Sequence, residues 1–172
     1  LINTMRTNFA KLIERKASLG LLWVFLFCGF NSFAQPGHTC AEAISLSTGN
    51  CGVYDNTFVP GTMGASCFTG LIKSMWFSFV ADSAGAIITV DGGNPQTMGR
   101  SSVAIFSNTG GCGGTFTELA GGCNNPNNNN SLINDSNLII GNTYYVLVDG
   151  RGSVGSFNIC LNLYSPEPIA PL

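Results

Sequence analysis

Cysteine is the residue type with the clearest chemistry in this chain, which holds seven of them. Cys28 lies in an apolar segment near the N-terminus, and the other six follow it: Cys40, Cys51, Cys67, Cys112, Cys123 and Cys160. An even number of cysteines behind an export signal predicts three disulfides, and the absence of a CxxC pair argues against zinc. Many pairings are open to six cysteines. We expect Cys51–Cys67 and Cys112–Cys123, which close short loops, and Cys40–Cys160, which joins the ends of the domain.

Residues for acid–base or nucleophilic catalysis are sparse. His38 is the single histidine and lies close to the expected mature N-terminus, so we interpret it as an exposed residue rather than a catalytic base. Paired cysteines cannot act as nucleophiles. Gly110–Gly114 lacks the Lys-Ser/Thr ending of a phosphate-binding loop. The sequence therefore predicts no catalytic residue and no enzyme.

Oxygen-bearing side chains beside glycine turns are the candidates for a metal site. Asp91 and Asn94 flank Gly92-Gly93, and Asp149 precedes another glycine-rich loop. Calcium prefers several hard oxygen ligands, two or more of them carboxylates. Asp-Gly turns also form without metal. We expect no cofactor, with calcium at Asp91, Asn94 and Asp149 as the alternative.

The elements that would position these residues are short strands separated by Gly, Asn and Ser. Residues 156–163 and 143–149 alternate apolar and polar side chains with a period of two, which is typical of strands. Six further runs are expected to be strands: 52–59, 74–81, 86–91, 102–107, 116–120 and 137–140. Residues 40–44 form the single helical turn that we expect, and 121–130 an exposed Asn-rich loop. The pattern predicts an all-β, disulfide-containing β-sandwich of jelly-roll type with about eight strands.

The same alternation predicts the core. Its expected members are Trp76, Phe77, Phe79, Tyr144, Val146, Val148, Phe157, Ile159 and Leu161.

Residues 1–34 have the layout of a secretory signal peptide. Basic residues from Arg6 to Lys16 precede an uncharged apolar stretch, residues 17–30, which ends near Ser32-Phe33-Ala34. We expect a start at Met5 and cleavage after Ala34. Because the apolar stretch is too short to span a bilayer, we expect no membrane insertion after cleavage and a secreted or cell-surface product.

Beyond the signal, residues 35–164 are expected to form one domain and residues 165–172 a Pro-rich linker, which implies that the chain is truncated from a longer protein. Basic residues are rare in this part: Lys73, Arg100 and Arg151 stand against a larger number of acids. No basic cluster exists to neutralise phosphates, so the charge pattern excludes a nucleic-acid partner.

Five segments carry a family resemblance. They are residues 40–44, residues 75–80, residues 104–107 followed by Cys112-Gly113, residues 142–148 and residues 155–160. In this order they resemble the pre-peptidase C-terminal domains, and similar cysteine-containing modules, of secreted Bacteroidetes-type proteins. The resemblance covers roughly residues 38–163. It implies a jelly-roll sandwich appended to secreted peptidases or repeated in large surface proteins.

Two departures from the family pattern concern acidic residues. Lys73-Ser74 stands where members often carry an acid, and Asn124-Asn125 follows Cys123 where they often carry an acidic run. These changes weaken the expectation of an inherited cation site.

The resemblance and the polar loops predict a non-catalytic accessory or adhesive binding module of a larger secreted or surface protein. Its expected partners are a polysaccharide or protein at the cell surface and other domains of the same polypeptide. The alternative is a ligand-free structural spacer or folding accessory between modules of a secreted peptidase or repeat protein.

Overall fold

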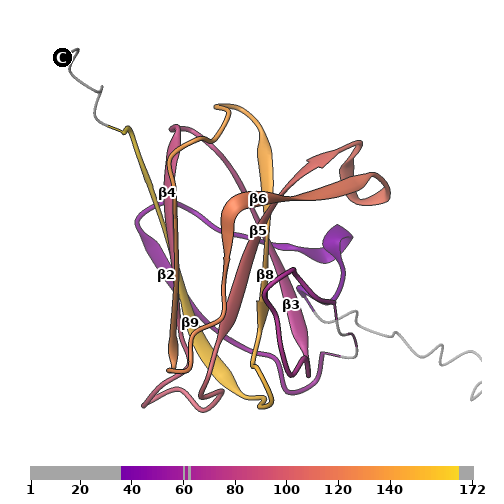
Figure 1. Ribbon diagram of the computed structural model, residues 1–172, viewed down its shortest axis with the longest axis vertical. Helices are drawn as coiled ribbons and strands as arrows, with labels where there is room; N and C mark the ends of the chain where they lie inside the picture. Colours follow the sequence, from indigo (N-terminus) through magenta and orange to yellow (C-terminus); the bar gives the residue numbers. More distant parts are fainter. Residues whose placement is uncertain (1–35, 60, 62, 167–172) are drawn as a thin grey trace, which may run out of the picture. The chain divides into compact units, whose positions relative to one another are not determined.

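The computed structural model describes residues 36–59, 61 and 63–166, and these form two β-sheets packed face to face (Figure 1). Nine strands and two short 3₁₀ turns make up its regular structure. The five-stranded sheet has the order β1 (Ile44–Ser45), β3 (Ser74–Val80), β8 (Thr143–Asp149), β5 (Ser102–Thr109) and β6 (Thr115–Asn124). The four-stranded sheet has the order β2 (Asn50–Asp55), β9 (Ser156–Tyr164), β4 (Gly85–Asp91) and β7 (Asn130–Asp135). The expected all-β sandwich is confirmed.

The strands pair as one long hairpin wound around itself. β5 and β6 form its tip, and β4 with β7, β3 with β8 and β2 with β9 follow outward from it. Successive pairs alternate between the two sheets. This winding is that of a jelly roll, and it makes β2, near the start of the domain, a neighbour of the last strand, β9.

Alternation along the strands divides apolar side chains between two clusters. Met75, Phe77 and Phe79 of β3 face the four-stranded sheet and join the main core. Eight of the nine expected core residues lie there, including all three from β8 and all three from β9. The ninth, Trp76, is buried but points the other way, into a second cluster on the outer face of the five-stranded sheet. Trp76 is therefore buried, as expected of a core residue, but in a different cluster from the other eight, because it alternates with Met75 and Phe77 along β3.

The outer face of the five-stranded sheet is covered by irregular chain. The turn η1 (Cys40–Glu42), the residue that follows it and the segment 63–73 contribute to the outer cluster the residues Cys40, Ala43, Ala65 and Phe68. Further along the face lies the turn η2 (Gly111–Gly113), between β5 and β6. These segments determine which parts of the outer cluster are accessible to solvent.

The prediction of a strand at residues 137–140 was wrong, and the strand β7 at residues 130–135 was not predicted. β7 alternates exposed and buried positions, but two of its three buried residues are Ser131 and Asp135, so its apolar pattern is weak. Residues 137–140 form a loop in which only Leu138 is buried while Ile139 and Ile140 are exposed. The expected Asn-rich loop shrinks to 125–129, because β6 continues to Asn124.

The six cysteines form three disulfides: Cys40–Cys112, Cys51–Cys160 and Cys67–Cys123. All three expected pairings were wrong. Two of the expected pairs close short loops and the third joins the ends of the domain, whereas the observed bridges span 72, 109 and 56 residues. The jelly-roll winding explains the difference, since it places Cys51 directly opposite Cys160 on β2 and β9.

The expected signal peptide, residues 1–34, and residues 167–172 of the expected linker lie outside the described residues. In the part of the chain that the structure does describe, no helix has the length and apolar character needed to cross a membrane.

Candidate binding surface

Four aromatic rings gather on the outer face of the five-stranded sheet. Trp76, Phe106, Phe116 and Tyr145 come from β3, β5, β6 and β8, four strands that lie side by side. Ring centroids are 5.1 Å apart for Trp76 and Phe116, 5.3 Å for Phe116 and Tyr145, and 6.1 Å for Trp76 and Phe106. These separations are those of favourable aromatic pairs.

The covering segments leave a hollow of about 320 Å³ beside Trp76 and Phe116, which we call the aromatic hollow. Met63 lines its wall with 40% of its surface exposed, whereas Trp76 is only 5% exposed. The Cys40–Cys112 disulfide borders it and joins η1 to the start of the β5–β6 connection. Most of the lining surface is apolar, so the hollow suits an apolar group.

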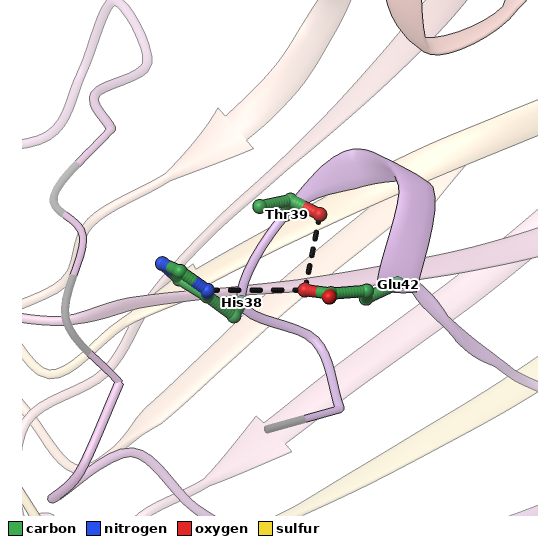
Figure 2. Close-up of polar contacts among 3 residues, drawn as sticks. All are labelled: His38, Thr39 and Glu42. Carbon is green, nitrogen blue, oxygen red and sulfur yellow. Dashed lines mark hydrogen bonds and ion pairs between the residues drawn. The ribbon is translucent and has the colours of Figure 1, made fainter. Parts of the chain in front are cut away.

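His38 and Thr39 line the aromatic hollow, and both contact Glu42. His38 Nδ1 lies 3.8 Å from Glu42 Oε2, and the Thr39 hydroxyl donates a hydrogen bond to the same oxygen at 3.1 Å (Figure 2). The His38 and Glu42 side chains are 32% and 33% exposed, so His38 is held against the domain and is more buried than we expected. Both cysteines that line the hollow are in a disulfide and offer no thiolate.

A buried carboxylate supports the loop that carries Met63. Asp149 at the end of β8 is 1% exposed and lies 2.9 Å from the Ser74 hydroxyl. It also accepts hydrogen bonds from the backbone N–H groups of Ile72 and Arg151. Ser74 Oγ in turn accepts a hydrogen bond from Met63 N at 3.1 Å. Asp149 therefore connects β8 to the wall of the aromatic hollow.

Burial raises the pKa of the Asp149 carboxyl above its ordinary value of 3.8, while the hydrogen bonds from Ser74, Ile72 and Arg151 oppose that effect. Desolvation disfavours the charged form of a carboxyl group, and donated hydrogen bonds favour it. Desolvation is the larger effect here. Asp149 can therefore couple pH to the stability of this end of the sheet.

The structure does not gather the three metal candidates into one cluster. Asp91 ends β4 and Asp149 ends β8, so the two carboxylates stand on different sheets. Each accepts a hydrogen bond within its own turn, Asp91 from Gly93 N and Asp149 from Arg151 N. Asn94 precedes Pro95 in the same loop as Asp91. Within the ranges that the structure describes, no group of three or more His, Cys, Asp or Glu side chains is placed to hold a metal ion.

A second hollow, of about 300 Å³, opens elsewhere on the same outer face, and we call it the amide hollow. It is lined by Asn108, Gly111, Gly141, Asn142, Thr143 and Tyr145. Both amide atoms of Asn108 are buried and have no hydrogen-bond partner. Our sequence reasoning did not identify Asn108, because nothing in its local pattern distinguishes it from the other asparagines of the chain.

No protein-family model matches this chain, and no curated protein matches it. Among solved structures, the chain is similar to the crystal structure of the pre-peptidase C-terminal domain of collagenase from Bacillus anthracis. The two share 12% sequence identity with a TM-score of 0.42, over 70% of this chain and 94% of the other. A similarity of this size does not establish membership of a family.

Proposed function

We propose that this chain is a non-catalytic extracellular binding module of a larger secreted or surface protein, and that it binds through the outer face of its five-stranded sheet. The observation that carries the proposal is the aromatic hollow, where the apolar walls around Trp76, Phe116 and Met63 remain partly uncovered. Concave, mostly apolar sites with a few polar groups at the rim are typical of ligand-binding sites.

The disulfides support both the location and the rigidity of such a site. Three bridges are typical of proteins that fold in an oxidising compartment. Cys40–Cys112 and Cys67–Cys123 fasten the segments that cover the outer face. A surface held in place before binding loses less conformational entropy when a partner arrives, which favours affinity.

The aromatic hollow would accept an apolar side chain of a protein or the apolar face of a sugar ring. Either fits the expected partners, a protein or a polysaccharide at the cell surface. His38 and Thr39, which line the hollow and contact Glu42, add polar groups beside the apolar wall. In the alternative function, a ligand-free spacer between modules, the same wall would serve packing alone.

The test introduces one charge into the wall. Met63→Glu places a carboxylate where burial against a ligand would remove it from water, and this substitution should abolish binding. The matched control is Val53→Glu, which places the same charge on β2 of the other sheet at a side chain that is 64% exposed. The full chain, exported to an oxidising compartment and fluorescently labelled, is measured for retention on insoluble cellulose, chitin and starch and on whole bacterial cells.

Retention of the unmodified protein and of Val53→Glu, with loss for Met63→Glu, would support the proposal. Equal retention of all three proteins would place binding away from the aromatic hollow. Absence of retention on every one of these surfaces would favour the spacer function instead.

A further inference from the structure

The amide hollow holds a polar group that the fold leaves without a partner. The Asn108 side chain lies near the end of β5, and neither its amide nitrogen nor its amide oxygen makes a hydrogen bond. Native proteins rarely bury such groups unpaired, and each exception calls for an explanation. Since the Asn108 side chain lines a hollow, a ligand that enters the hollow can supply the missing partners after a rotation of the side chain.

The other lining groups are also uncharged hydrogen-bonding groups. Asn142 and Thr143 lie at the start of β8 and are exposed, and Tyr145 is half-buried beside them. Within the described part of the chain, no carboxylate, ammonium or guanidinium group lines the hollow. Each asparagine amide presents a donor and an acceptor together, and each hydroxyl can do both. This set is complementary to a ligand whose own groups both donate and accept, and it offers no charge to attract an ion.

The hollow also has an aromatic wall. The ring of Tyr145 packs edge to face against Phe116, which lines the aromatic hollow, so the two hollows are neighbours on one face. The volume of about 300 Å³ lies at the lower end of the range for small-molecule sites, and it suits a single ring-sized unit. Sugar rings combine hydroxyl groups at their edge with apolar C–H faces that pack on aromatic rings.

We propose that the amide hollow binds one unit of a neutral saccharide, with Asn108 and Asn142 bonding its hydroxyl groups and Tyr145 packing against its ring. This inference rests on the proposed function, and it assigns the ligand class and a subsite to the outer face. Asn108 is the residue on which it depends most, because among the described residues that line the hollow it alone combines a buried amide with the lack of a partner.

The experiment follows the backbone and side-chain N–H resonances of the full, exported chain by two-dimensional NMR during titration with maltose, cellobiose, lactose and diacetylchitobiose to millimolar concentrations. We expect saturable shifts of the Asn108 and Asn142 amides with at least one of these sugars. Asn108→Ala should weaken that binding at least about tenfold, equivalent to about 1.4 kcal/mol. Asn162→Ala is the matched control, since Asn162 is exposed on β9 of the other sheet.

Thermal unfolding of both variants checks that they fold. Asn108→Ala removes no hydrogen bond and takes away a desolvated amide, so its melting temperature should not fall below that of the unmodified protein. Saturable shifts confined to Trp76 and Phe116, with unchanged affinity in Asn108→Ala, would overturn the saccharide subsite while the proposed function stands. Absence of saturable shifts with all four sugars would also overturn it, and a protein partner retained through Met63 would then still support the proposed function.

Discussion

Asp149 and Asn108 are two polar side chains that differ in the hydrogen-bond partners that the fold gives them. Asp149 is buried with three donors around it, so its charge is partly compensated. Asn108 is half-buried, but both atoms of its amide are buried without a partner, a situation that costs about 1–3 kcal/mol for a neutral group. Asp149 connects a loop to a strand through its hydrogen bonds. The unpaired amide of Asn108 lowers the stability of the fold, and no structural role accounts for it.

The raised pKa of Asp149 makes stability depend on pH in a defined direction. Its folded-state pKa exceeds the ordinary value of 3.8, so the folded state holds this proton more tightly than the unfolded state does. The stabilisation is present below about pH 3.8 and is lost as the pH rises through the folded-state pKa. We expect urea unfolding to show the unmodified protein losing stability relative to Asp149→Asn over that window, with a constant difference above it. A gain in stability as the pH rises toward 3.8, with no change above that pH, would mean that the hydrogen bonds outweigh desolvation.

Replacing the unpaired amide of Asn108 should make the domain more stable. Asn108→Leu removes a desolvated polar group and extends the aromatic cluster, so the free energy of unfolding should rise by about 1 kcal/mol. Denaturant unfolding of both proteins measures the change. A loss of stability would show that the amide has a partner in solution.

At the scale of elements, the disulfides hold irregular chain to the sheets as well as strand to strand. Cys51–Cys160 links β2 to β9, which already pair through their backbones. Cys40–Cys112 links η1 to η2, two short turns with no backbone ladder between them in the described part of the chain. The second bridge therefore has the larger local effect on the aromatic hollow.

Removing each bridge separates these roles. Cys40→Ser with Cys112→Ser should lower stability by up to about 4 kcal/mol and speed amide hydrogen exchange in residues 36–46. Cys51→Ser with Cys160→Ser should lower stability by a similar amount but leave exchange in residues 36–46 slow. Mass spectrometry of exchanged peptides measures both. Equal exchange of this segment in the two variants would show that η1 is held without its bridge.

The whole domain depends on contacts between residues far apart in sequence. β2 pairs with β9 across nearly the full length of the jelly roll, and the Cys51–Cys160 bridge spans 109 residues. Folds dominated by such contacts lose loop entropy before they gain contact energy, so they fold slowly. A bridge that already joins the outermost strands removes part of that entropy cost.

Folding kinetics test this reasoning. The protein with all three bridges should refold severalfold faster than Cys51→Ser with Cys160→Ser, as followed by stopped-flow far-ultraviolet circular dichroism after dilution from urea. Equal refolding rates, with faster unfolding of the variant, would show that β2 and β9 pair only after the rate-limiting step.

Local patterns were enough to predict much of the fold. The expected strand at 143–149 coincides with β8, and those at 74–81 and 156–163 differ from β3 and β9 by one residue each. Period-two alternation also placed Phe77, Val146 and Ile159 in the core. These features depend on neighbours along the chain, because a strand turns successive side chains to opposite faces.

Tertiary structure decided everything that depends on which segments meet. The cysteine pairing, the outward direction of Trp76, the polar interior of β7 and the unpaired amide of Asn108 all follow from the winding of one hairpin into two sheets. The candidate surface is of this kind too, since its rings come from four strands and its rim from η1. Its geometry could not be read from the sequence, because alternation tells which residues share a face of a strand but not what covers that face.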